Sequence, residues 1–174
     1  MRPETWILPM LACLTAPLLQ GIINRVKAVV AGRHGQPILQ TYYDIAKLLR
    51  KGTVYSKSTS MVFRIAPVLI LAVMLVATCL VPWGGLPAPL AFTGDFIVLA
   101  YLLGLARFAT VLAALDTGSS FEGMGASREV LFGALTEPSL LLGMLVLAFT
   151  TGGSSLTAIA AGIAPASGAA KAAP

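Results

Sequence analysis

Charged side chains are scarce in this sequence. Asp, Glu, Lys and Arg together make up only 11 % of its 174 residues, less than half of the roughly 25 % found in an average soluble domain. Hydrophobic residues reach 57 %, and the mean hydropathy is +0.86. A disordered chain has the opposite balance, and a soluble globular domain carries more charge. The composition therefore predicts an integral membrane protein.

Metal-binding and disulfide-forming residues are also few. The sequence has one histidine, His34, and two cysteines, Cys13 and Cys79, which lie within apolar runs and have no C-x-x-C partner. These counts support neither a zinc site nor a disulfide framework. The string Asp116-Thr-Gly-Ser matches an aspartic-protease signature. That enzyme needs two such aspartates on a β scaffold, so the match indicates no protease.

Long apolar stretches dominate what is present. A helix needs about 20 mostly apolar residues to span a bilayer, and four stretches come close to this length, at residues 6–23, 62–81, 96–115 and 130–150. We expect an all-α, polytopic fold with one transmembrane domain over residues 1–155. Residues 156–174 begin with an apolar run that is too short to span and continue as an Ala/Pro-rich tail, which we expect to be disordered.

Basic residues are concentrated in one loop. Seven of the twelve Lys and Arg lie between Arg25 and Lys57. This loop joins two apolar stretches, which favours the positive-inside effect over a nucleic-acid patch. Loop 82–95 has no Lys or Arg, and loop 116–129 has Arg128 alone. We therefore expect the N-terminus outside, loops 24–61 and 116–129 in the cytoplasm, and no binding to nucleic acid.

One segment of the basic loop has the pattern of a surface helix. Residues 37–51 carry apolar side chains at i, i+4, i+7 and i+11 on one side and polar side chains on another, as an amphipathic interfacial helix does. Pro37 suits the first helical position and Gly52 the end. Such a helix either rests on the membrane or is a docking surface for a cytoplasmic partner, and its two tyrosines and mixed charges suit docking.

Two ionisable residues are expected at membrane depth, where each costs at least about 2.5–3.5 kcal/mol. Glu137 precedes Pro138, which removes a backbone donor, so an acidic group stands beside a loosened turn. Arg107 lies in the middle of the third stretch and needs an acidic partner, for which Glu137 is a better candidate than Asp116. These residues belong either to a proton or ion path or to a structural ion pair.

The segment between the third and fourth stretches is rich in small residues. Residues 116–129 contain three glycines, which predicts a tight turn or a re-entrant loop. Ser127 is placed to cap the fourth helix, with Arg128 and Glu129 in its first turn.

Three strings carry a family resemblance. The first is the basic string from Arg25 to Lys51, which includes Arg33-His-Gly-Gln-Pro-Ile-Leu-Gln-Thr-Tyr-Tyr-Asp. The second is Gly94-Asp, followed by Tyr-Leu-Leu-Gly-Leu-Ala-Arg107-Phe. The third begins with Leu115-Asp-Thr-Gly-Ser, continues through Gly-Ala-Ser-Arg-Glu129 and ends with Thr-Glu137-Pro. Together they resemble the membrane subunits of group 4 nickel–iron hydrogenases, of the formate hydrogenlyase subunit 4 type. Those subunits are homologous to subunit 1 of respiratory complex I. The resemblance covers about residues 20–150, the N-terminal half of that family.

The resemblance implies roles for particular residues. It implies a non-catalytic subunit that anchors a cytoplasmic electron-transfer arm and couples it to proton or sodium movement. The implied ion-coupling residues are Arg107, Asp116, Glu122, Glu129 and Glu137. The implied subunit-interface residues are Arg25, Lys27, Arg33, Gln36, Gln40, Asp44, Lys47 and Arg128.

The resemblance also implies partners. These are hydrogenase large and small subunits, iron–sulfur subunits and antiporter-like membrane subunits, in a bacterial or archaeal cytoplasmic membrane. The iron–sulfur clusters and the nickel–iron centre are expected on those subunits, and the resemblance implies that this chain binds no metal or cofactor itself. Two other hypotheses stay open: the quinone-site subunit of a NADH–quinone oxidoreductase (complex I), and a stand-alone small transporter or a truncated fragment.

Overall fold

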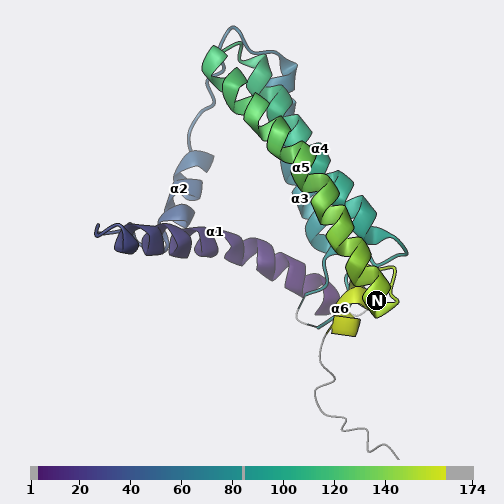
Figure 1. Cartoon of the computed structure of the whole chain (residues 1–174). Coiled ribbons are helices and arrows are strands. Elements are labelled where there is room, and N and C mark those ends of the chain that lie inside the picture. The colour runs from purple at the N-terminus through teal and green to yellow at the C-terminus, as the bar shows by residue number, and fades with distance from the viewer. Residues whose placement is uncertain (1–3, 84, 164–174) are drawn as a thin grey trace, which may run out of the picture. The chain divides into compact units, whose positions relative to one another are not determined.

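The fold is helical. A computed structural model describes residues 4–83 and 85–163, and within these ranges it has helices and no strand (Figure 1). The helices are α1 (Glu4–Val30), α2 (Gln40–Leu49), α3 (Met61–Leu80), α4 (Asp95–Asp116), α5 (Ser120–Thr151) and α6 (Leu156–Ile163). Of these, α1, α3, α4 and α5 are long and apolar enough to cross a membrane. The predicted all-α polytopic fold is confirmed.

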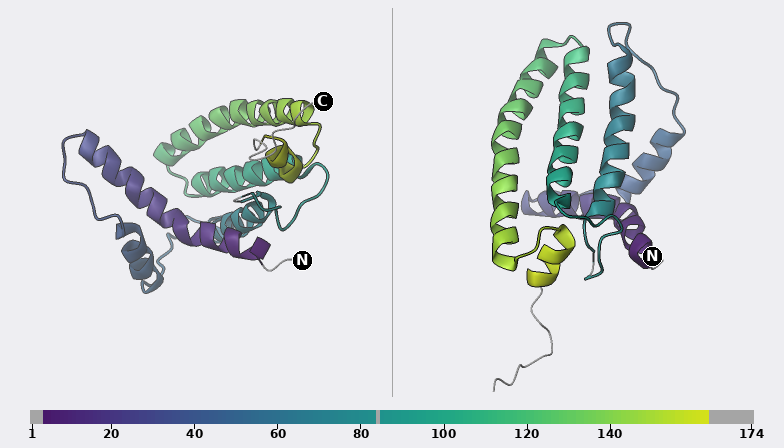
Figure 2. Two further views of the ribbon diagram at one scale, coloured as in Figure 1. Left: turned by 90° about the horizontal axis from the view of Figure 1, so that it is seen from below. Right: turned by 90° about the vertical axis from the view of Figure 1, so that its right-hand side faces the viewer.

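The chain forms two compact units. One contains α1 and α2 and ends at residue 55, and the other begins at residue 56 and contains α3 to α6. The expected single domain over residues 1–155 stays a prediction. In the larger unit, α4 lies between α3 and α5, and the three long helices run side by side (Figure 2, right).

Small side chains form the contacts between the three long helices. Without a hydrophobic driving force between helices in lipid, association depends on close backbone approach, which small residues permit. The buried positions of α3 and α4 are mostly alanine, and α5 contributes an alanine and a glycine. These residues are Ala66 and Ala77 of α3, Ala100, Ala106 and Ala109 of α4, and Ala126 and Gly133 of α5.

Asp116, the last residue of α4, is fixed to the first turn of α3. Its Oδ2 accepts hydrogen bonds from the backbone N–H groups of Ser60, at 2.7 Å, and Phe63, at 3.3 Å. The Ser60 hydroxyl oxygen accepts from Val62 N at 3.2 Å. The first N–H groups of a helix have no partner within the helix, so these two side chains together cap α3.

The connection between α4 and α5 is much shorter than the sequence predicts. The predicted loop over 116–129 is wrong, because α5 begins at Ser120. Only Gly118 of its three glycines has a positive φ, +69°, so the turn uses this glycine and the other two continue a helix. Ser127 caps nothing; its hydroxyl donates to Met124 O at 2.9 Å within α5.

Both helices of the smaller unit differ from the predicted bounds. The first apolar stretch is expected to end at residue 23, but α1 continues to Val30, because the basic residues after the apolar run are also helix-compatible. The predicted surface helix over 37–51 is shorter, because Gln40 N donates to Pro37 O at 3.0 Å and forms a turn before α2 begins.

A short helix occupies part of the predicted tail. Leu156–Ile163 form α6, so the expectation of disorder is wrong for these residues, and the rest of the tail, 164–174, lies outside the described residues. Leu156 and Ile159 are buried. Leu156 N donates to Asp95 Oδ1 at 2.7 Å. This capped N-terminus and apolar packing explain why eight residues too short to span are still helical.

Candidate functional site

Neighbouring helices bring three ionisable side chains together. Arg107 of α4 lies between two carboxylates of α5: its Nε is 3.2 Å from Glu129 Oε1, and its Nη1 is 4.0 Å from Glu137 Oε1. The glutamates are eight residues apart, a little over two helical turns, so both side chains reach α4. The predicted Arg107–Glu137 pairing is confirmed, and the shorter contact to Glu129 was not predicted. We call these three residues the ionic cluster.

Two glycines leave the space that the ionic cluster occupies. A Cβ on Gly133 of α5 would lie 2.9 Å from Arg107 Cδ and 3.0 Å from its Nη1. A Cβ on Gly104 of α4 would lie 3.1 Å from Glu137 Oε1. Each charged side chain therefore crosses the opposite helix at a glycine, and a larger residue at either position would displace it.

The ionic cluster borders an open groove. Side chains of Glu129 and Glu137 are 50 % and 49 % exposed, whereas Arg107 is 28 % exposed. The groove has a volume of about 370 Å³, and apart from Arg107 and Glu137 its lining is apolar. This volume is large enough for several water molecules, at about 30 Å³ each. Of the two carboxylates, Glu137 lines this groove.

The charges of the ionic cluster do not balance. One guanidinium faces two carboxylates, which leaves a net charge of −1 when both are ionised. The Nη1 atom of Arg107 is buried and has no hydrogen-bond partner among the described residues, since Glu137 at 4.0 Å is beyond hydrogen-bond distance. A small rotation of the guanidinium would strengthen its contact with one carboxylate at the expense of the other.

Two of the predicted ion-coupling residues lie apart from the ionic cluster. Asp116 caps α3, as described above. Glu122 is an exposed residue in the first turn of α5, and it makes no ion pair within the described part of the chain. The sequence therefore placed five residues on one path, and the structure groups three of them.

The predicted subunit-interface residues are at the surface. In the smaller unit, Asp44 Oδ1 accepts a hydrogen bond from Gln40 Nε2 at 3.0 Å along α2. The Tyr42 hydroxyl of α2 donates to Leu14 O of α1, and a Cβ on Gly21 of α1 would overlap the backbone of Ile38. The residues predicted at the interface are all exposed or half-exposed: Arg25 and Lys27 of α1, Arg33 and Gln36 between α1 and α2, Gln40, Asp44 and Lys47 of α2, and Arg128 of α5.

Asp95 was missing from the predicted site residues. It is completely buried at the start of α4. Its Oδ1 accepts from Leu156 N, and its Oδ2 has no hydrogen-bond partner in the described residues. A signal was present in the sequence, since Asp95 is the single charged residue between Arg64 and Arg107. Sequence pattern alone reads it as an ordinary first-turn acidic residue.

A metal centre has no support in the described part of the chain. Within residues 4–83 and 85–163, no three His, Cys, Asp or Glu side chains lie close enough together to hold a metal ion. The site that the structure assembles is thus an ionic one.

Comparison with known proteins identifies relatives. The sequence model of a family described as NADH dehydrogenase matches residues 4–167. Formate hydrogenlyase subunit 4 of Escherichia coli (strain K12) is 42 % identical over 144 residues, which are 83 % of this chain and 47 % of the relative. Hydrogenase-4 component C of the same organism is 41 % identical over 146 residues, 84 % of this chain and 46 % of the relative. The matches thus span about half the length of these relatives.

Proposed function

This chain belongs to the NADH dehydrogenase family, and from this premise we propose that it is a membrane-anchor and ion-coupling subunit of an energy-converting nickel–iron hydrogenase complex. Identity of 42 % and 41 % to a formate hydrogenlyase subunit and a hydrogenase component supports this choice within the family. The chain itself would be non-catalytic. It would link electron transfer in cytoplasmic subunits to proton or sodium movement.

The ionic cluster is the observation that carries the ion-coupling role. The cluster sets one guanidinium against two carboxylates, and binding of one proton by either glutamate makes it neutral. Movement of the guanidinium towards Glu129 leaves Glu137 to take the proton, and movement towards Glu137 does the reverse. A displacement of α5 driven by redox chemistry in a neighbouring subunit would thus move a proton between two sites.

The partners of such a complex follow from the proposed role. Hydrogenase large and small subunits, iron–sulfur subunits and antiporter-like membrane subunits would assemble with the chain. Iron–sulfur clusters and the nickel–iron centre would lie in those subunits. The polar residues predicted at the interface, which run from Arg25 to Lys47 and include Arg128 of α5, would contact them. The complex would sit in a bacterial or archaeal cytoplasmic membrane with the N-terminus of this chain outside.

A substitution of Glu137 tests the role of the ionic cluster. Glu137→Gln removes the charge and keeps the size, so we expect proton or sodium movement to fall about tenfold or more, in line with the effect of removing a positioned proton carrier. Hydrogenase turnover with a soluble electron donor should stay near that of the unaltered complex. The measurement is ion uptake by vesicles that contain the purified complex.

Glu4→Gln provides the matched control, because it removes the same charge from another helix. If Glu137→Gln and Glu4→Gln support the same ratio of ions moved to hydrogen produced, the ionic cluster has no part in coupling.

The quinone-site subunit of a NADH–quinone oxidoreductase is the second candidate, and the description of the matching family favours it. This function predicts that a purified complex reduces quinone with NADH and is blocked by quinone-site inhibitors. Hydrogen production by the complex in the absence of quinone would exclude it.

A further inference from the structure

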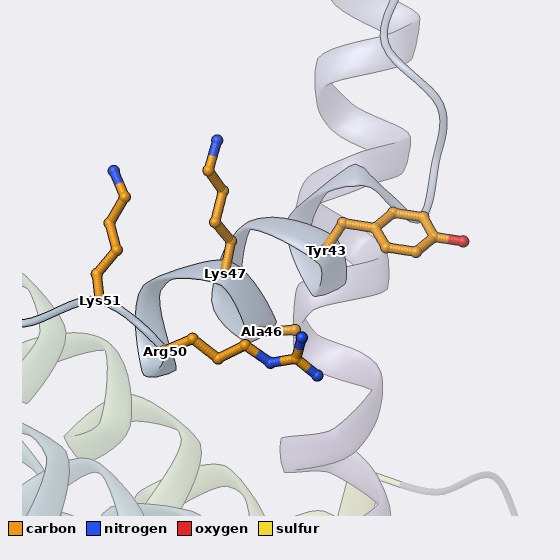
Figure 3. A pocket seen from close by; sticks show the side chains of 5 residues that line it. All are labelled: Tyr43, Ala46, Lys47, Arg50 and Lys51. Carbon is orange, nitrogen blue, oxygen red and sulfur yellow. The ribbon is translucent and has the colours of Figure 1, made fainter.

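The end of α2 carries a group of basic side chains. Lys47, Arg50 and Lys51 lie within five residues of one another and, with Tyr43 and Ala46, line a hollow of about 510 Å³ (Figure 3). Figure 3 shows the side chains of Lys47 and Lys51 extended side by side, away from the helix. We call these three cations and Tyr43 the basic hollow.

The three cations of the basic hollow have no acidic partner. Within the described residues, the ion pairs found involve none of them. Between Arg25 and Tyr55 the sequence has one acidic residue, Asp44, and its Oδ1 already accepts from Gln40. Like charges one helical turn apart repel each other. The basic hollow therefore lacks an anion that would relieve this repulsion.

Apolar side chains stand beside the cations. Leu48 and Leu49 are 65 % and 83 % exposed, and Ile45 is 41 % exposed. No residue of α2 is buried. A phospholipid has an acyl chain that can contact the exposed leucines and a negatively charged headgroup that can pair with the neighbouring cations.

The position of α2 places it within reach of lipid. Its Tyr42 hydroxyl bonds to Leu14 O, and its N-terminal side packs at Gly21. Leu14 and Gly21 both belong to α1, which is long and apolar enough to cross a membrane. A helix packed against such a segment lies beside lipid, and its long Lys and Arg side chains can extend towards headgroup phosphate.

From these contacts we propose that the basic hollow binds the headgroup of an anionic phospholipid. The phosphodiester lies between the ammonium groups of Lys47 and Lys51, and the guanidinium of Arg50, which extends in another direction in Figure 3, adds to the positive potential of this end of α2. The acyl chains cover Leu48 and Leu49. This site assigns Lys47 to lipid, whereas the sequence placed it among contacts to a protein subunit.

Lipid binding by the purified full chain tests the site directly. The probes are phosphatidylglycerol and phosphatidylcholine with the same acyl chains, and native mass spectrometry measures the bound lipid. We expect a preference for phosphatidylglycerol that the variant Lys47→Gln/Arg50→Gln/Lys51→Gln weakens on the order of a hundredfold, since each cation strengthens binding to an anionic lipid by about fivefold. These side chains are exposed, so the variant should fold, and circular dichroism checks this.

The matched control removes the same charge elsewhere. Arg25→Gln/Lys27→Gln/Arg33→Gln also deletes three cations of this unit, and it should keep the preference for phosphatidylglycerol. Equal loss in both variants would show a general charge effect and overturn the site. Equal binding of the two lipids by the unaltered chain would overturn it as well.

A cross-linking experiment separates lipid from a protein occupant. A photoreactive phenylalanine analogue at Tyr43, activated in native membranes, should form adducts with phospholipid. An adduct with an acidic protein segment in place of phospholipid would overturn the proposal. Both outcomes are independent of hydrogenase activity, so they distinguish this site from the proposed function of the complex.

Discussion

Arg107 is the residue on which the site depends. Its Nε lies 3.2 Å from one carboxylate, and its Nη1 lies 4.0 Å from another and has no hydrogen bond in the described residues. The guanidinium therefore has one close carboxylate and approaches a second without forming a hydrogen bond to it. The ionic cluster thus differs from a single bidentate pair, in which one carboxylate accepts from two guanidinium N–H groups.

Two other acidic residues of the larger unit, Asp95 and Asp116, cap helices and lie outside the ionic cluster. Asp116 and Asp95, at the two ends of α4, accept from backbone N–H groups of α3 and α6. Both aspartates fix neighbouring elements to α4. The two aspartates are carboxylates, like Glu129 and Glu137, but they accept hydrogen bonds from backbone N–H groups and do not pair with a guanidinium.

Replacement of Asp116 should measure its capping role. Asp116→Ala leaves the N–H groups of Ser60 and Phe63 without their acceptor, and a lost N-cap costs about 0.5–2 kcal/mol. Asp116→Asn keeps an acceptor oxygen and should lose less. Thermal unfolding of the purified chain in detergent gives the difference. An alanine variant as stable as the unaltered chain, but deficient in ion coupling, would instead support the path predicted from sequence.

At the scale of elements, the approach of α4 and α5 is set by glycine. Gly104 and Gly133 lie where charged side chains of the opposite helix cross. Small residues at such crossings are the usual means by which membrane helices approach. Here they also leave room for ionisable groups, so the packing of two helices and the placement of charges have one cause.

We therefore expect Gly133→Ala to uncouple ion movement from hydrogen production without unfolding the protein. The new methyl group would meet Arg107 Cδ at 2.9 Å, and because this side chain is flexible it moves away from the glutamates. Alanine is about 1 kcal/mol more favourable than glycine inside a helix, so thermal stability should not fall. Ion movement per hydrogen produced should drop by up to about a hundredfold, the effect of displacing a positioned group by about 1 Å.

Gly143→Ala is the control for this variant. It lies on the same helix α5, and a Cβ there has no atom within 4 Å, so it gains helix propensity without touching the ionic cluster. If both variants move the same number of ions per hydrogen produced, the position of Arg107 beside Gly133 has no part in ion coupling.

At the scale of the molecule, the larger unit has two distinct ends. The start of α3 and the connection between α4 and α5 meet at one end through Asp116, and the loop before α4 meets α6 at the other through Asp95. Because α5 has 32 residues, it is about 48 Å long at 1.5 Å per residue. The hydrocarbon core is about 30 Å thick, so part of α5 projects beyond it.

Labelling of single cysteines should determine the orientation of this unit. Ser119→Cys, in the short turn before α5, and Ser154→Cys, after it, are exposed positions, and Cys13 and Cys79 are replaced by alanine in both. The positive-inside effect predicts that a membrane-impermeant maleimide added to intact cells labels Ser154→Cys alone. Inverted vesicles should show the opposite pattern. Labelling of Ser119→Cys from outside would reverse the proposed topology.

The sequence predicted the spans well and the segments between them poorly. Apolar length alone indicates a helix that crosses a bilayer, because lipid leaves few alternatives to helical hydrogen bonding. The glycines of residues 116–129 predict a loop, yet Gly123 and Gly125 continue α5. Glycine in a helix costs only about 1 kcal/mol, so packing of α5 against α4 decides its conformation.

Composition and apolar periodicity by themselves determined that this protein is all-α and membrane-spanning, and that Arg107 requires an acidic partner. Only the tertiary structure decided which partner it has, that Glu129 is closer than Glu137, and that Asp116 caps α3. The physical reason is that the ability of a segment to span a membrane depends on the apolar length of that segment alone. The distance between two charged atoms on different helices depends instead on which residues let those helices approach.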